Sequence, residues 1–336
     1  MKARDKVWLV VVLATFWLAS DASASWYAAG IAAPDSGKSS IGSDEIRQSG
    51  DQVFSRDRQQ WAVLQPAGDD GLNMVPARPP QRETAPDGIP DGYIVTDVAG
   101  NRAWYAQPTS RYGHGALGDG IEAGSLVVEV AGETRRLDLP PTQVFEDIAP
   151  RIADLDGDGA ADFVTIRSGL TSGAAIAVYT LRNGRLVESA ATRPIGQPSR
   201  WLNIAGIADF NGDGSLDIAQ VVKPHLTGEL EILSLKNGGF QRIARVAGLS
   251  NHIFGSTELN MSAIADVNGD GIMDLVLPRF GQRALSAYSF AKNAERLFEV
   301  AIPGRIVTAI GVVRAGNRPV FVFGDGNGEL VAVRSR

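Results

Sequence analysis

The stretch RIADLDGDGAADFVTI, residues 151–166, decides the fold of this chain. It places four aspartates and two glycines within nine positions and then runs directly into an apolar segment typical of a strand. Two near-copies follow, GIADFNGDGSLDIAQVV from Gly206 and AIADVNGDGIMDLVLP from Ala263. The concentrated negative charge therefore belongs to a repeated unit rather than to a single site.

The repeat has a long period. Its acidic loops begin at Asp154, Asp209 and Asp266, which are separated by 55 and 57 residues. Beyond residue 100, short β-type runs such as SLVVEV, AAIAVYTL and ELEILSL alternate with Gly, Asn and Asp turns. Runs of this length at this spacing indicate an antiparallel all-β domain, and a period with several strands is typical of a propeller.

Each period reads in the same order. A strand enters the acidic loop, a second strand leaves it, and two further strands meet at an Asn-containing turn, which is RNGR at Arg182, KNGG at Lys236 and KNAE at Lys292. Asn-Gly between two β runs is a strong hairpin signal. Four strands per period predict a β-propeller of four-stranded antiparallel blades. We expect about five blades, with six or seven as open alternatives.

The rest of the chain is less regular. We expect residues 25–100 to form an irregular Pro/Gly-rich segment, with a short helix near Ser43 to Arg47, and residues 101–336 to form the propeller. The last repeat is one strand short, and we expect RAWYAQ from Arg102 to fill the vacant edge. The stretch GDGIE at residues 118–122 is interpreted as the remnant of an acidic loop.

The N-terminus predicts secretion. Three basic residues precede thirteen largely apolar residues, Val7 to Ala19, and an Ala-Ser-Ala step ends at Ala24. This is the pattern of a signal peptide over residues 1–24, and the apolar run is shorter than the roughly 18 residues of a membrane span. An uncleaved anchor is the alternative. We expect a secreted protein, periplasmic or at the cell surface, without a stable membrane span after cleavage.

Composition narrows the class of protein further. The chain has no cysteine, so a secreted fold must rest on its core or on bound metal rather than on disulfides. The formal net charge of −6 argues against nucleic acid as a partner.

The acidic loops share the pattern D-x-[DN]-G-D-G-x-x-D, which brings side-chain oxygens from positions 1, 3, 5 and 9 and the carbonyl of position 7 toward one point. Calcium prefers six to eight such oxygens, and the absence of nitrogen and sulfur ligands argues against zinc, copper and iron. The sequence therefore predicts about three Ca²⁺ ions. The expected ligands are Asp154, Asp156, Asp158, Ala160 and Asp162; Asp209, Asn211, Asp213, Ser215 and Asp217; and Asp266, Asn268, Asp270, Ile272 and Asp274.

A simple turn is the alternative interpretation of each loop, because Asp, Asn and Gly favour turns without any metal. Three loops with the same spacing, each crowding carboxylates that repel one another without a cation, favour the metal. An EF-hand would place its last acid at position 12 between helices. Here the last acid is at position 9 and a β run follows at once.

These loops resemble those of the FG-GAP or VCBS repeat family, which includes the β-propellers of integrin α-chains. The resemblance covers residues 140–300 well, whereas the Phe-Gly and Gly-Ala-Pro signatures of the family are poorly kept. It implies calcium at the loop that joins the first two strands of each blade. It also implies that a ligand would bind at the opposite face.

The links expected on that opposite face carry basic and aromatic residues. We expect Arg167, Trp201, Lys223, His225, His252 and Arg279 to gather there and to bind an anionic glycan, a carboxylate or an acidic protein patch. Ordinary solvated bases and a buried tryptophan are the alternative. His114, His225 and His252 are the only histidines, and their unequal positions in the repeat disfavour a three-histidine metal site.

Function is less determined than fold. No catalytic residue is predicted, because the chain lacks a Cys nucleophile, G-x-S-x-G, H-E-x-x-H and a P-loop. We expect a calcium-binding module or scaffold for a protein or glycan partner. A lyase or hydrolase acting on a polysaccharide is the alternative.

Overall fold

The computed structural model describes residues 25–31, 42–67, 71–315 and 318–335. All regular secondary structure in these ranges is β-strand, so the expected all-β class is confirmed. The expected signal peptide lies outside the described residues. In the part of the chain that is described, no helix is long and apolar enough to cross a membrane.

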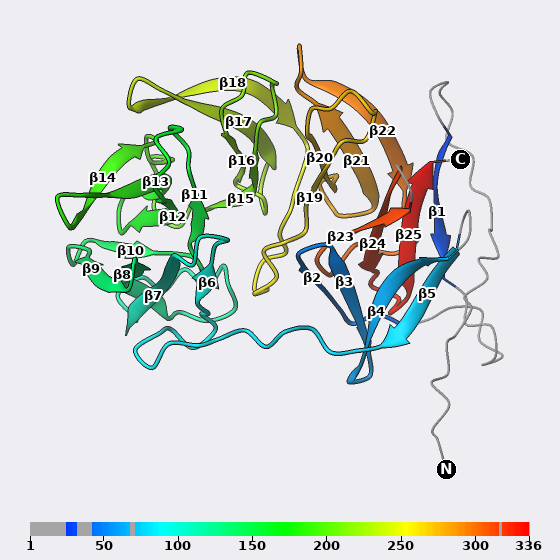
Figure 1. Ribbon diagram of the computed structural model, residues 1–336, viewed down its shortest axis with the longest axis horizontal. Coiled ribbons are helices and arrows are strands. Elements are labelled where there is room, and N and C mark those ends of the chain that lie inside the picture. Colours follow the sequence, from blue (N-terminus) through cyan, green and yellow to red (C-terminus); the bar gives the residue numbers. More distant parts are fainter. Residues whose placement is uncertain (1–24, 32–41, 68–70, 316–317, 336) are drawn as a thin grey trace. The chain divides into compact units, whose positions relative to one another are not determined.

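The chain falls into two compact units. Unit 1 comprises residues 1–80, 249–251 and 260–336. Its three four-stranded antiparallel sheets have the orders β2-β3-β4-β5, β19-β20-β21-β22 and β1-β25-β24-β23 (Figure 1). The strands are β1 (Trp26–Gly30), β2 (Glu45–Ser49), β3 (Gln52–Asp57), β4 (Gln60–Ala67), β5 (Gly71–Pro76), β19 (Ala263–Ala265), β20 (Asp274–Pro278), β21 (Ala284–Ser289), β22 (Glu295–Ala301), β23 (Gly311–Ala315), β24 (Arg318–Gly324) and β25 (Leu330–Ser335).

Unit 2 comprises residues 81–248 and 252–259. It contains a nine-stranded sheet with the path β14-β13-β12-β10-β8-β7-β6, to which β9 adds beside β8 and β11 beside β12, and a four-stranded sheet β15-β16-β17-β18. The strands are β6 (Val95–Thr96), β7 (Arg102–Thr109), β8 (Glu122–Val130), β9 (Glu133–Asp138), β10 (Gln143–Phe145), β11 (Arg151–Ala153), β12 (Asp162–Gly169), β13 (Gly173–Arg182), β14 (Arg185–Ala191), β15 (Leu202–Ala208), β16 (Asp217–Val222), β17 (Glu229–Lys236) and β18 (Gly239–Ala247).

Burial follows the position of each strand in its sheet. The second and third strands of a repeat are almost wholly buried, as in DFVTI of β12 and AAIAVYT of β13. The fourth strand β18 alternates exposed polar and partly buried residues, because only one of its faces is covered. In unit 2, Trp201, Ile204 and Ile218 belong to one apolar cluster that spans both sheets.

The expected hairpins are confirmed. Asn183 and Gly184 have φ angles of 52° and 72° between β13 and β14, and Asn237 and Gly238 have 53° and 74° between β17 and β18. Two successive positive φ values define a turn whose twist matches the flanking strands, and Asn-Gly is the pair that adopts them most easily.

The first strand of the repeat that contains Asp154 is broken. β10 pairs with the far end of β12, from Arg167 to Gly169, and β11 pairs with its near end, from Asp162 to Val164. The five residues between β10 and β11 leave the ladder, and they place the side chains of Glu146 and Asp147 in the interior with no exposed surface. This interruption positions two buried carboxyl groups.

The completion of the last sheet differs from our expectation. Trp26 to Gly30 of β1 pair with Ser335 to Val331 of β25, so the N-terminal strand fills the vacant edge (Figure 1). The stretch from Arg102, which we expected there, is β7, and both of its edges are already paired with β6 and β8. β1 buries Trp26 and Ala29, which gives it the apolar surface that an added strand needs.

Two further expectations were wrong. The stretch from Glu45 to Pro76 is a meander of four strands, β2 to β5, rather than irregular chain with a short helix. Ile46, Val53, Leu64 and Leu72 enter the unit 1 core, and this burial outweighs the polar composition. The acidic loops join the first and second strands of a repeat, whereas GDGIE lies between β7 and β8, the second and third strands of theirs, so it is no remnant of an acidic loop. The link in the position of an acidic loop is the turn from Asp97 to Asn101, between β6 and β7.

Candidate functional site

Three acidic loops share one local structure. Loop 1 (154–162) joins β11 to β12, loop 2 (209–217) joins β15 to β16, and loop 3 (266–274) joins β19 to β20. Each therefore connects the first two strands of its repeat, although loop 3 belongs to unit 1 and the others to unit 2. The nine-residue spacing leaves room for one tight loop before the second strand begins.

The first aspartate of each loop organises the backbone. Asp154 accepts hydrogen bonds from the amides of Gly157 at 2.9 Å and Gly159 at 3.0 Å. The two glycines have φ angles of 75° and 84°, which side-chain-bearing residues rarely adopt. The same bonds recur in the other loops, to Asp209 from Gly212 at 2.7 Å and Gly214 at 2.8 Å, and to Asp266 from Gly269 at 2.7 Å and Gly271 at 3.0 Å.

The last aspartate of each loop is buried at the start of the second strand. Asp162, Asp217 and Asp274 are 4%, 0% and 0% exposed. Each accepts a hydrogen bond from the amide of the loop's second residue, at 3.0 Å, 3.3 Å and 2.8 Å respectively. Burial raises the pKa of Asp162 and of Asp274 to about 6 and also raises that of Asp217.

The carboxylates of loop 1 converge. One oxygen from each of Asp154, Asp156 and Asp162 lies within 4.8 Å of the others. Asp158 is outside this group, and its carboxylate accepts the amide of Ala160 at 2.7 Å. In loop 3, the buried Oδ1 of Asp274 has no hydrogen-bond partner among the described residues. A set of hard oxygen atoms that includes such an acceptor fits Ca²⁺.

Loop 2 differs from the others at its fifth position. Nζ of Lys236, from the hairpin between β17 and β18, lies 2.8 Å from Oδ2 of Asp213. This bond lowers the pKa of Asp213. The ammonium group of Lys236 is therefore bound to Asp213, one of the carboxylates that the sequence predicts to bind calcium.

A hydroxyl group opposite each last aspartate escaped the sequence analysis. Thr180 pairs with Asp162 across β12 and β13, and Ser234 pairs with Asp217 across β16 and β17. Ser234 donates a hydrogen bond to Asp217, and the hydroxyl groups of Thr180 and Ser289 lower the pKa of Asp162 and Asp274 against the effect of burial. A hydroxyl three or four residues before the hairpin asparagine was the available signal.

The residues expected on the ligand face are only partly brought together. Trp201, His225 and His252 meet in unit 2, with ring centroids 5.8 Å apart for Trp201 and His225 and 4.7 Å apart for Trp201 and His252. Arg167 instead pairs with Glu188 of its own sheet. Arg279 lies in unit 1, 3.6 Å from Glu299.

The two histidines form a hydrogen-bonded pair. Nε2 of His225 lies 2.7 Å from Nδ1 of His252, and Nε2 of His252 lies 2.8 Å from the carbonyl oxygen of Ser256. Burial lowers the pKa of His225 to about 4 and that of His252 to about 3, so both rings are neutral at pH 7. Because a carbonyl only accepts, Nε2 of His252 carries its proton, and Nε2 of His225 donates to the ring beyond it.

A second pair missed by the sequence analysis adjoins the first. Nδ1 of His114 lies 2.5 Å from the buried carboxyl of Glu146, which also accepts a bond from Ser168. Trp201 donates its indole hydrogen to the backbone oxygen of Glu146 at 2.9 Å. Burial raises the pKa of Glu146, against the hydrogen bonds from His114 and Ser168.

All three histidines thus lie together in unit 2. Phe254, which is 57% exposed, has its ring 6.1 Å from that of His114 and 5.3 Å from that of His225. We call these residues with Trp201 and His252 the histidine cluster. Within the described ranges, the one group of three or more acidic or histidine side chains whose ligand atoms are close enough to share an ion is that of loop 1.

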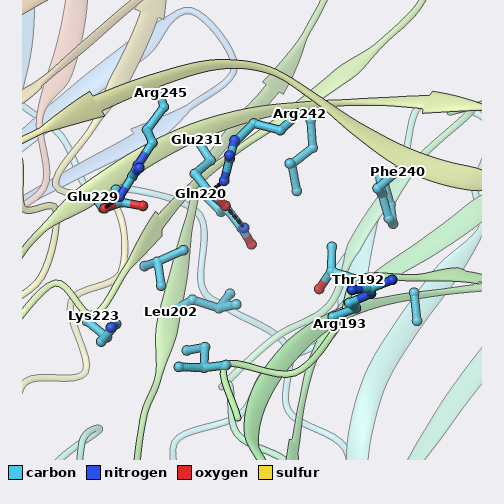
Figure 2. A pocket seen from close by; sticks show the side chains of 14 residues that line it. Thr192, Arg193, Leu202, Gln220, Lys223, Glu229, Glu231, Phe240, Arg242 and Arg245 are labelled. Atoms are coloured by element: carbon cyan, nitrogen blue, oxygen red, sulfur yellow. Dashed lines mark hydrogen bonds and ion pairs between the residues drawn. The ribbon is translucent and has the colours of Figure 1, made fainter.

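A polar pocket of about 670 Å³ lies elsewhere in unit 2. It is lined by the chain that follows β14 and by one face of the β15 to β18 sheet (Figure 2). Of the residues expected on the ligand face, Lys223 alone lines it.

Comparison with known proteins supports the repeat assignment. Residues 148–219 match the family described as FG-GAP-like repeat, which confirms the resemblance inferred from the loops. This match covers loops 1 and 2 and ends at Ala219, within β16. The chain therefore contains an FG-GAP-like repeat. No curated protein matches the sequence.

Several solved structures are similar to this chain in outline. BBS1N in complex with ARL6DN is 11% identical with a TM-score of 0.45, and the match covers 92% of this chain and 87% of that one. The rhamnogalacturonan lyase YesW is 12% identical with a TM-score of 0.49, covering 88% and 67%. The rhamnogalacturonan lyase PL11 of Bacillus licheniformis is 13% identical with a TM-score of 0.43, covering 81% and 54%. Likenesses this weak say nothing about ligand or activity.

Proposed function

We propose that the protein is a secreted calcium-binding module that presents a binding surface to a protein or glycan partner. The observation that carries this proposal is the three-fold recurrence of one hydrogen-bonded acidic loop, in which position-1 and position-9 aspartates hold the same backbone amides. A single loop of this composition could be explained as an ordinary turn, because Asp, Asn and Gly favour turns without any metal. Three loops with the same hydrogen bonds support a cation site that recurs in each repeat.

Calcium would act here through folding. An ion held by Asp154 and Asp156 of the loop and by Asp162 of the next strand joins two strands and cancels the repulsion among their carboxylates. Its binding free energy then adds to the free energy of unfolding. Extracellular sites of this kind have dissociation constants of about 0.1 to 1 mM, so ambient calcium would set stability.

The β-propeller and its blade number belong to this proposal. The nine-stranded sheet contains two groups of four strands, and four further sheets have four strands each. We infer six blades, one more than the sequence suggested. Location outside the cytoplasm rests on the signal-like residues 1–24.

Isothermal titration with calcium, and with magnesium as control, tests the proposal. We expect about three calcium ions per chain and little response to magnesium. Asp154→Asn should remove one ion, whereas Asp51→Asn, an exposed aspartate in the turn before β3, should remove none. A protein that contains no calcium after purification and binds none on titration would contradict the proposal.

A polysaccharide-active enzyme is the second candidate, and the histidine cluster favours it. The two hydrogen-bonded imidazoles and the nearby pair of His114 and Glu146 are side chains of the kinds that act in general acid–base catalysis. Activity on an acidic polysaccharide that is lost in His225→Gln, in protein with an unchanged melting temperature, would support this function.

A further inference from the structure

The polar pocket in Figure 2 combines features that the calcium loops do not explain. It is formed by β15 to β18 on one side and by the residues after β14 on the other, all within unit 2. Its volume of about 670 Å³ is within the range of small-molecule sites.

An unsatisfied acceptor lies in its wall. Nε2 of Gln220 donates to Oε2 of Glu231 at 2.8 Å, and reversing the amide would set two oxygens against each other, so this bond fixes the amide orientation. Gln220 is 4% exposed, and its Oε1 has no hydrogen-bond partner within the described residues. A buried acceptor without a donor is costly, and a hydroxyl of a bound molecule would satisfy it.

The charges of the pocket do not balance. Arg242 pairs with Glu231 at 2.6 Å, and Arg245 pairs with Glu229. Arg193 and Lys223 line the same pocket and have no ion-pair partner in the described part of the chain. Two unmatched cations favour a ligand that carries a carboxylate or another anionic group.

The remaining wall is apolar. Leu202 and Leu233 are buried, and the ring of Phe240 is partly buried, on the same lining. A ligand for this pocket therefore needs hydroxyl donors for Gln220, an anionic group for Arg193 and Lys223, and an apolar face. Inorganic phosphate lacks an apolar face, and a neutral sugar lacks the charge. A pyranose ring that carries a carboxylate supplies all three.

We propose that this pocket binds a hexuronic acid residue of an acidic polysaccharide. The inference deepens the proposed function, and rests on it, by assigning the glycan partner to one class and one place. The ring would lie on the apolar wall, and its hydroxyls would donate to Oε1 of Gln220. Its carboxylate would face Arg193, and Lys223 adds positive charge on the other side of the pocket (Figure 2).

Titration calorimetry with trigalacturonate at a fixed calcium concentration tests the assignment, with galactotriose as the uncharged probe and inorganic phosphate as the simple anion. We expect trigalacturonate alone to bind. The double variant Arg193→Gln and Lys223→Gln should weaken binding by about tenfold or more. The single variant Arg185→Gln, at the exposed first residue of β14, should leave it unchanged.

Each contrary outcome points to a different error. If Arg185→Gln weakened trigalacturonate binding as much as the double variant does, the effect would come from the overall charge of the protein and not from the pocket. If phosphate bound as tightly as trigalacturonate, the pocket would be an anion site without selectivity for a sugar. Unchanged affinity in Gln220→Met would remove the role of the buried amide and leave it as the partner of a water molecule. Absence of trigalacturonate binding in protein that still binds calcium would overturn this inference while the proposed function stands.

Discussion

Glu122 shows how the fold alters the chemistry of a single side chain. The carboxyl is 2% exposed at the start of β8, and its pKa is raised to about 9. Burial is the main cause, followed by the charges of Glu146, Asp119 and Asp147. Glu122 is therefore protonated at neutral pH in the folded protein, whereas in the unfolded chain it ionises.

This difference predicts a pH-dependent effect of Glu122→Gln. Because the folded-state pKa is raised from 4.5 to about 9, the wild type loses stability as pH rises through that window, and the glutamine variant does not. The variant should gain up to about 4 kcal/mol in free energy of unfolding, relative to wild type, between about pH 5 and pH 8. Urea unfolding of both proteins at pH 5 and pH 8 measures this difference in the free energy of unfolding. If the difference were the same at both pH values, Glu122 would be ionised in the folded protein at its buried position, and the prediction would be wrong.

Lys236 predicts a difference among the three loops. Its ammonium is bound to Asp213 of loop 2, so a calcium ion must displace it there. Lys236→Met should tighten calcium binding at one site a few-fold by removing this competitor. Lys292→Met, in the corresponding exposed turn between β21 and β22, should change nothing. Titration calorimetry compares the two, and weaker binding in Lys236→Met would show that the lysine supports the loop instead.

At the scale of elements, β1 ties the two ends of the sequence together. Trp26 stacks on Phe298 of β22 with ring centroids 4.3 Å apart and lies 5.9 Å from Phe321 of β24. Trp26→Ala should reduce the free energy of unfolding by about 3 to 5 kcal/mol, because it empties a buried aromatic site. Tyr27→Ala, on the more exposed face of the same strand, should cost less. Equal losses in denaturant unfolding would show that pairing of β1, not packing of Trp26, stabilises the sheet.

Sequence patterns predicted the elements whose signal is local. The Asn-Gly turns at Asn183 and Asn237 and the strands flanking the acidic loops follow from backbone preferences of neighbouring residues. β1 was missed because its partner β25 lies at the far end of the chain, and no local pattern records such a pairing. β2 to β5 were missed because short strands with one buried face resemble polar loop sequence.

The candidate sites also differ in whether their residues are close together in the sequence. The spacing within each acidic loop is visible in sequence because all of its side chains come from nine consecutive residues. The histidine cluster unites residues from separate links, and Glu146, which bonds to His114, lies in the interruption between β10 and β11. Arg167 and Arg279 were assigned to a ligand face by their place in the repeat, but each contacts a carboxylate of its own sheet.

At the scale of the whole molecule, the free energy of calcium binding at the three loops adds to the free energy of unfolding. Ten carboxylates lie in the three loops, and the folded state holds them closer together than the unfolded chain does. With free calcium at about ten times the dissociation constant, each site should contribute about 1.4 kcal/mol, or about 4 kcal/mol for three sites. A chain of 336 residues has an unfolding entropy of about 0.7 kcal/mol per kelvin, so we expect calcium to raise the melting temperature by about 6 °C over EGTA.

A calorimetric melt across a calcium series measures this shift, with magnesium at the same ionic strength as control. A calcium-specific rise that saturates, and that falls by about a third in Asp154→Asn, would show that the sites act separately and add. A rise that vanishes in that single variant would show instead that loops 1, 2 and 3 order one another. No rise, in protein that metal analysis shows to be free of calcium, would mean that the carboxylates tolerate their mutual repulsion unaided and that the loops are turns alone.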